Sequence, residues 1–87
     1  MSHPSLSLTG ILYKEGTTVC ALCPELDVAS HGATLREAKA MLNEAVSGYL
    51  ETCFESNLPF LRPVSPEDDP RIRDKRSVLK TFRMALL

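Results

Sequence analysis

The sequence predicts an α+β domain of order β-β-β-α-β, in which a small antiparallel sheet carries one long amphipathic helix on one face. Three short apolar stretches, separated by turn residues, occupy the first third of the chain. A capped stretch with the 3.6-residue apolar period of a helix follows over residues 34–55. The connections between the strands are too short for parallel crossovers, so neighbouring strands must run antiparallel.

The first two strands are predicted over residues 6–14 and 18–23, and they form a hairpin. The turn between them contains Gly16, which is suited to a positive φ. In the first strand, Gly10 permits a bulge or a change of face. The second strand becomes apolar on both faces, which indicates a central place in the sheet.

A short third strand is predicted over residues 28–31. Pro24 cannot donate a hydrogen bond to a neighbouring strand, so it ends the second strand, and Gly32 ends the third. The three strands therefore form an antiparallel meander.

The helix over residues 34–55 has clear signals at both ends. Thr34 and Glu37 have the Thr-x-x-Glu spacing of a capping box, Asn57 suits a left-handed C-terminal cap, and Pro59 prevents further helix. One stripe of the helix is apolar and is predicted to lie across the sheet. Its members are Leu35, Ala38, Leu42, Ala45, Val46, Tyr49, Leu50 and Cys53.

Residues 61–77 are predicted to form an extended polar connection with no core to join, because prolines accompany an acidic run at 67–69. Residues 78–87 fit either a fourth strand or a helix of three turns. Clustered β-branched and aromatic residues favour the strand, and no helix cap is obvious beyond Ser77. The chain thus divides into a core over residues 1–60, the connection, and a final segment that completes the domain.

Composition narrows the class of protein. Lys and Arg number 10 and Asp and Glu 11, so the net charge of −1 argues against a protein that coats nucleic acid. No apolar run approaches the roughly 20 residues that span a bilayer, and three cysteines, an odd number, favour a reducing compartment. We expect a cytoplasmic protein without membrane association. An 87-residue chain has a small core, so self-association is expected to supplement it.

Cys20 and Cys23 form a Cys-x-x-Cys that invites a zinc or redox interpretation. In a strand, however, residues three apart point to opposite faces, which favours buried thiols that act as small apolar side chains. His31 is a candidate general base, but the sequence offers it little to activate beyond Ser30 and the distant Cys53.

Charged residues are grouped at two places. Glu37, Glu44, Glu51 and Glu55 share a stripe of the helix nearly opposite the apolar one. The stripe is either a solvated face or an acidic ridge for a basic partner. The C-terminal part is basic and fits either solvated charges on a strand edge or a contact with nucleic acid. Its basic residues are Arg71, Arg73, Lys75, Arg76, Lys80 and Arg83.

Four features follow one another at a characteristic spacing. They are the corner Pro24-Glu25-Leu26, the strand Val28-Ala29-Ser30-His31-Gly32, Thr34 with Glu37-Ala38, and a helix with Ala45 and Tyr49-Leu50. Together, over about residues 6–60, they resemble the HicB-like antitoxin family. The resemblance implies a partial ribonuclease-H-like sheet with one helix packed on it, and dimers or tetramers. It also implies binding to a small basic toxin ribonuclease, HicA, whose catalytic site is covered.

The chain departs from this family at three places. The glycine of the family's corner is replaced near Asp27-Val28, and Ala33 stands where an acidic residue commonly precedes the helix threonine. About 20 residues follow Pro66, which is too few for the helix-turn-helix unit that many members append. No DNA-binding domain is therefore expected, although a lone dimerising ribbon remains an alternative.

From the resemblance we expect a non-enzymatic, antitoxin-like protein that binds and occludes a HicA-like toxin, with no catalytic residue, cofactor or metal. Glu25 at the corner and Glu37, Glu44 and Glu51 on the helix are the candidate partner contacts. The alternatives are a stand-alone self-associating domain, a ribonuclease-H-like nuclease and a small nucleic-acid-binding module. A nuclease of that type needs clustered carboxylates that hold divalent metal ions, and the predicted strands contain almost no acidic residue.

Overall fold

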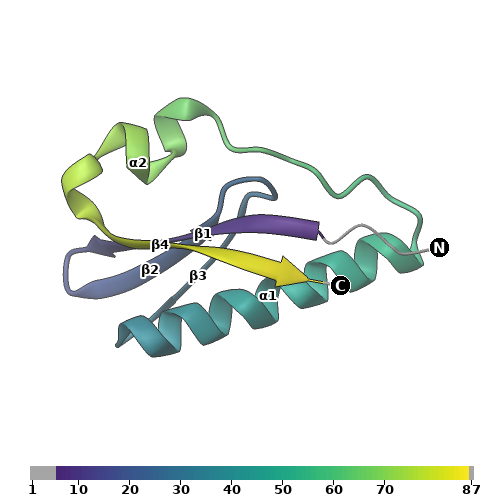
Figure 1. Ribbon diagram of the computed structural model, residues 1–87, viewed down its shortest axis with the longest axis horizontal. Coiled ribbons are helices and arrows are strands. Elements are labelled where there is room, and N and C mark those ends of the chain that lie inside the picture. The colour runs from purple at the N-terminus through teal and green to yellow at the C-terminus, as the bar shows by residue number, and fades with distance from the viewer. Residues whose placement is uncertain (1–5, 87) are drawn as a thin grey trace.

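The computed structural model describes residues 6–86 and has the predicted order of elements (Figure 1). A meander of three strands is followed by one long helix, a connection with three short helical turns, and a last strand. The elements are β1 (Leu6–Glu15), β2 (Thr18–Cys23), β3 (Val28–Gly32), α1 (Leu35–Glu55), η1 (Pro66–Asp68), α2 (Pro70–Arg73), η2 (Lys75–Ser77) and β4 (Val78–Leu86).

The four strands form one antiparallel sheet in the order β3-β2-β1-β4. β1 therefore lies inside the sheet, and β3 and β4 are its edges. β4 pairs with β1 along nearly its whole length, with Leu8 opposite Met84. The α+β prediction is confirmed, and the strand interpretation of residues 78–86 is correct in place of the helix.

The turns of the meander take positive φ at the positions that need it. Gly16 has φ 64° between β1 and β2. Asp27, at the corner before β3, has φ 54°, as does Asn57 after α1. Asp and Asn tolerate this left-handed conformation better than most residues. Asp27 thus supplies a left-handed residue in the turn between β2 and β3.

α1 begins at the predicted capping box. The backbone N–H of Glu37 donates to Thr34 Oγ1 at 3.1 Å, and the Glu37 carboxylate accepts from the N–H of Ala33 at 3.3 Å. The buried face of α1 comprises Ala38, Leu42, Val46, Leu50 and Cys53, and Tyr49 is partly buried beside them. The prediction is wrong for Leu35, which is 44% exposed because it stands in the first turn, beyond the dense part of the core.

Gly10 leaves room for an aromatic ring instead of forming a bulge. A Cβ atom at Gly10 would lie 2.2 Å from the ring of Phe82, its partner on β4. The ring therefore packs directly on the β1 backbone, and Lys39 Nζ lies 4.6 Å from the centroid of the same ring. The irregularity in the β1–β4 register falls between Leu12 and Tyr13, so the bulge expected at Gly10 is displaced toward the hairpin.

The connection between α1 and β4 contains three short helical turns rather than being extended as predicted, and it lies against the sheet. Ile11 and Leu22, paired across β1 and β2, are buried, and so is Pro70 of α2. The N–H groups of Arg62 and Val64 donate to the carbonyl oxygens of the Pro24-Glu25 corner at 3.0 and 2.9 Å. These bonds hold the connection on the sheet, opposite α1.

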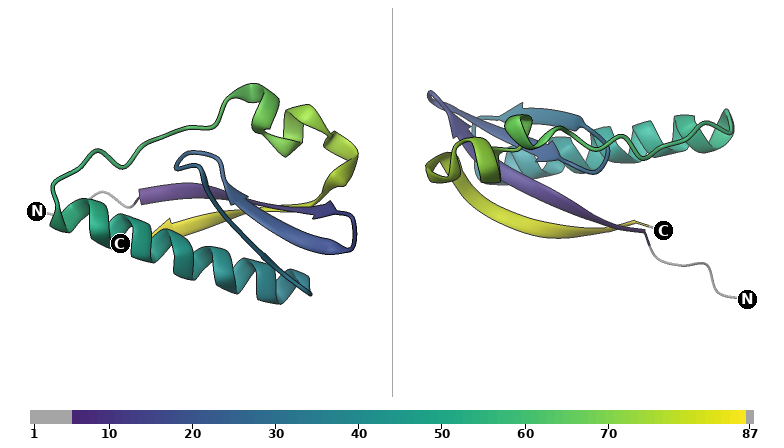
Figure 2. Two further views of the ribbon diagram at one scale, coloured as in Figure 1. Left: turned by 180° about the vertical axis from the view of Figure 1, so that it is seen from behind. Right: turned by 90° about the horizontal axis from the view of Figure 1, so that it is seen from above.

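The sheet is consequently covered on both sides. Figure 1 shows α1 below the strands and the connection with α2 above them, and the views of Figure 2 show the same layers from behind and from above. Among residues 6–86, no helix combines the length and the apolar character that crossing a bilayer requires.

Candidate partner-binding surface

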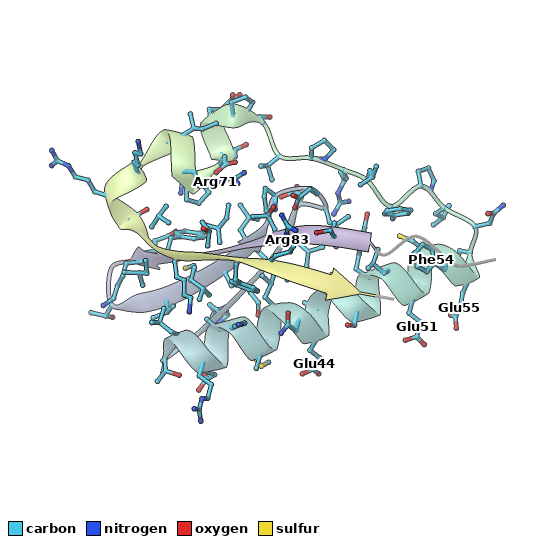
Figure 3. The ribbon with its side chains drawn as sticks, in the orientation of Figure 1. Glu44, Glu51, Phe54, Glu55, Arg71 and Arg83 are labelled. Carbon is cyan, nitrogen blue, oxygen red and sulfur yellow. The ribbon has the colours of Figure 1, made fainter. Side chains whose placement is uncertain are left out.

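The acidic residues of α1 lie on its outer side. Figure 3 shows Glu44, Glu51 and Glu55 pointing away from the sheet, and all three are exposed. No described cation lies within ion-pair distance of them, since the ion pair of residues 6–86 is Arg71 with Asp69. We call Glu44, Glu51 and Glu55 the acidic ridge. A basic surface can bind these three carboxylates without first breaking an internal contact.

Glu37 belongs to this stripe by spacing, but its carboxylate already serves the helix cap. It accepts the hydrogen bond from the Ala33 N–H while remaining exposed. A partner contact there would compete with this hydrogen bond of the capping box. Glu37 is thus less available than the three acidic residues that follow it.

Glu25 is placed differently from the stripe and is only half-exposed. Its carboxylate accepts hydrogen bonds from the N–H and the hydroxyl of Thr9 at 3.0 and 2.7 Å. Partial burial by itself raises the pKa of Glu25, but these hydrogen bonds outweigh burial and leave the pKa below its usual value. The residue fastens the corner to β1, and both of its oxygens are occupied.

Asp69 and Arg71 form an ion pair at the start of α2, within the connection. The buried Asp69 carboxylate accepts from Arg71 Nη2 at 2.7 Å and from the Arg71 backbone N–H at 2.9 Å. The hydrogen bonds from Arg71 lower the pKa of Asp69. The hydrogen bond to Asp69 raises the pKa of Arg71, and the negative charge of Glu25 also raises it. Glu25 therefore lies close enough to Arg71 for their charges to interact.

An apolar patch at the end of α1 is a feature that sequence reasoning missed. Phe54, Leu58 and Leu61 are 57%, 54% and 62% exposed. The ring of Phe54 meets that of Phe60 edge-on at 5.4 Å, and these four side chains line a hollow of about 510 Å³. We call Phe54, Leu58, Phe60 and Leu61 the terminal apolar patch. Exposed apolar groups gathered in this way mark interaction sites.

The patch is held in shape by contacts behind it. The hydroxyl of Tyr49 donates to the carbonyl oxygen of Phe60 at 3.0 Å, and the Arg62 guanidinium lies 5.5 Å from the Tyr49 ring centroid. These contacts fix the chain after α1 against the helix. The available signal in the sequence was Phe54, an aromatic residue outside the apolar stripe, together with Leu58 and Leu61 beyond the helix end.

The cysteines point to opposite faces, as their spacing in a strand predicts. Cys23 is buried on the side of the sheet that faces α1. Its pKa is raised to about 12, and burial is the largest cause. Cys20 is half-exposed rather than buried, and it lines a hollow of about 450 Å³ with Tyr13 and His31. Desolvation raises the pKa of Cys20 as well, so its thiol keeps its proton at neutral pH and is a poor nucleophile.

The structure provides no assembled metal centre within the part of the chain that it describes. Across residues 6–86, no three side chains of His, Cys, Asp or Glu converge in a way that would hold a metal ion. Cys20, Cys23 and Cys53 are all free thiols.

The acidic ridge and the terminal apolar patch meet at one end of α1. Figure 3 places Glu51, Phe54 and Glu55 on the last two turns of the helix, with the aromatic residue on a different side from the two acids. Such a surface offers an apolar centre bordered by acidic residues on one side, and an apolar centre with a polar rim is the usual anatomy of a protein-binding site. Comparisons of the chain with protein-family models, with curated proteins and with solved structures find no match.

Proposed function

We propose that this chain is a non-enzymatic, antitoxin-like protein that binds a small basic toxin ribonuclease of the HicA type and occludes its catalytic site. The proposal joins the family resemblance to the surface at the end of α1. The order β-β-β-α-β is the one that the resemblance implies. The protein would act in the cytoplasm, by steric cover and charge complementarity, without covalent chemistry.

The observation that supports the proposal best is the apolar patch beside the acidic ridge. Three large apolar side chains are more than half exposed there, and Glu51 and Glu55 border them without a cationic partner among the described residues. A partner with a basic rim and an apolar centre would bury the patch and neutralise the ridge. A basic ribonuclease, whose own surface must attract RNA, fits this description.

The two parts of the surface have different roles in binding. Rim charges chiefly steer the encounter and raise the association rate, and the effect weakens with salt. Buried apolar anchors chiefly slow dissociation, because truncation of one removes about 1–2 kcal/mol or more. Phe54 is the anchor in this scheme, and Glu51 and Glu55 are the steering charges.

The direct test begins with the protein encoded beside this chain. If that neighbour is a small basic protein, it is purified, its RNA cleavage is measured, and the chain is added in rising amounts. Stoichiometric inhibition with formation of a complex is expected. Cleavage that continues unchanged in the presence of excess chain would contradict the proposal.

Matched variants then separate steering from anchoring. Glu51→Lys with Glu55→Lys is expected to lower the association rate by about tenfold at low salt. Phe54→Ala is expected to raise the dissociation rate by about tenfold. Glu67→Lys with Asp68→Lys in η1 is the control, because these two exposed acidic residues give the same change of charge but lie on the connection, away from α1.

The second candidate function is a stand-alone self-associating domain without a toxin. The same patch favours it, because two copies could bury their apolar residues against each other. Sedimentation of the wild-type chain and of Phe54→Ser over a range of concentrations separates the two proposals. A dimer or tetramer that the substitution dissociates, with no toxin bound, favours self-association.

A further inference from the structure

A basic groove lies near the start of α1, at the opposite end of the helix from the terminal apolar patch. The groove runs between α1 and β4 and has a volume of about 420 Å³. Its floor is apolar and includes Leu12 and Leu35. The polar side chains of its lining all carry N–H groups that can donate hydrogen bonds, and they are Arg36, Lys39, Asn43 and Lys80.

The cations of this basic groove have no negative partner within the described chain. No carboxylate lines the groove, and the ion pair found over residues 6–86 is elsewhere, between Arg71 and Asp69. Arg36 and Lys39 also stand in the first turns of α1, where the helix dipole disfavours positive charge. An anionic group that entered the groove would relieve both sources of repulsion.

One lining residue of the groove, Lys39, is held against the ring of Phe82. One face of the Phe82 ring rests on Gly10, where a Cβ atom would lie 2.2 Å away. Lys39 Nζ lies 4.6 Å from the centroid of the same ring. The ring is therefore in contact both with the backbone of Gly10 and with the ammonium group of Lys39. The aromatic ring is thus already in use, and it is a poor platform for stacking a nucleic-acid base.

The groove borders the free edge of β4. In the sheet order β3-β2-β1-β4, only β1 pairs with β4 among residues 6–86, so the outer row of β4 backbone groups has no partner from the described strands. From Lys75 to Leu86 the chain carries the cations Lys75, Arg76, Lys80 and Arg83 and no acidic residue. Lys80 belongs both to this edge and to the groove.

We propose that β4 and the basic groove bind an extended acidic segment of a partner protein, which adds to the sheet as a fifth strand beside β4. Backbone hydrogen bonds to the edge of β4 would give the register. Alternate side chains of the added strand would face the α1 side, where acidic groups meet Lys80 and Lys39. This surface is separate from the terminal apolar patch, so the proposal does not depend on toxin binding.

The charge of the edge argues against a second copy as its occupant. Two β4 strands paired with each other would bring Lys80 and Arg83 of both copies onto one short ladder, and like charges across strands are destabilising. The same lysine and arginine residues that guard the edge against self-pairing therefore leave it open to an acidic strand.

The test uses blocked peptides of nine residues, the length of β4. One alternates valine and glutamate, and its counterpart alternates valine and lysine. We expect the acidic peptide to bind, to shift the amide resonances of β4 and to slow the hydrogen exchange of amides on its outer edge. Binding should weaken as salt is raised. The lysine peptide should not bind.

Paired variants locate the site. Lys39→Glu with Lys80→Glu is expected to weaken binding of the acidic peptide by about tenfold or more. Arg73→Glu is the control, because it reverses an exposed cation on α2, on the other side of the sheet, and binding should persist. Circular dichroism of each variant confirms that the domain is folded.

Three results of the peptide experiments would overturn the proposal. They are an acidic peptide that leaves the β4 resonances unchanged, equal loss of binding in the control variant, and tighter binding of an oligothymidine than of the acidic peptide at the same residues. A dimer of the wild-type chain that Lys39→Glu with Lys80→Glu dissociates would likewise assign the edge to self-association.

Discussion

The contact between Gly10 and the Phe82 ring gives a sharp test of how β1 and β4 pack. We expect Gly10→Ala to destabilise the domain, because the added Cβ would lie 2.2 Å from the ring. Forcing the ring aside costs about 1–3 kcal/mol as overpacking, and the lost Lys39 contact adds about 0.5–1 kcal/mol. The backbone of Gly10 lies outside the left-handed region, so alanine adds no strain there.

The same substitution should reverse its sign when the ring is absent. In a Phe82→Ala background the Cβ of Ala at position 10 meets no ring, and alanine within a strand is favoured over glycine by about 0.5–1 kcal/mol. The two substitutions should therefore couple by about 2 kcal/mol or more. Urea unfolding of the wild type, both single variants and the double variant, followed by circular dichroism, measures the coupling. Equal costs of Gly10→Ala in both backgrounds would refute the packing argument.

Three further predictions concern the layers on either side of the sheet. Leu42→Ala should lower the free energy of unfolding by about 2–5 kcal/mol, measured in urea, because Leu42 is fully buried. Met41→Ala is the control: this residue is 42% exposed, and the free energy of unfolding should change by about 0.5 kcal/mol or less. Gly32→Ala should loosen the start of α1, because its Cβ would lie 2.7 Å from a backbone nitrogen of the helix; faster amide exchange in the first turn, compared with the last, measures this. The pKa of Glu25 is lowered in the folded state, so its contribution is present above about pH 4 and is lost as the pH falls through the folded pKa. Glu25→Gln should flatten the acid side of a stability-against-pH curve, and an unchanged slope would show that the bonds to Thr9 do not stabilise the fold.

The elements that could be predicted from the sequence are those with a local signal. Thr34 and Glu37 mark the start of α1 by spacing alone, and the structure places both in the cap. Asn57 takes the left-handed conformation after the helix, as a residue of its type can. These features depend on residues that are close together in the sequence, so a local pattern is enough to predict them.

The features that could not be predicted depend on contacts between distant segments. Nothing local in Pro70 indicates that it will be buried, because its burial depends on the connection turning back over the sheet. From the sequence, Glu25 is expected to be an exposed corner residue. In the structure its carboxylate is bound by Thr9, which is distant in the sequence. The terminal apolar patch arises in the same way, since Phe54 and Phe60 meet only when the chain turns after α1.

The position of β1 between β2 and β4 has a consequence for how the domain assembles. A two-residue turn joins β1 to β2. Hairpins of this kind form within microseconds. Its other neighbour, β4, follows in the sequence only after α1 and the whole connection, so the β1–β4 half of the ladder closes a long loop and carries its entropy cost. We therefore expect pairing of β4 with β1 to form later than the hairpin, and to open before it in fluctuations of the native state.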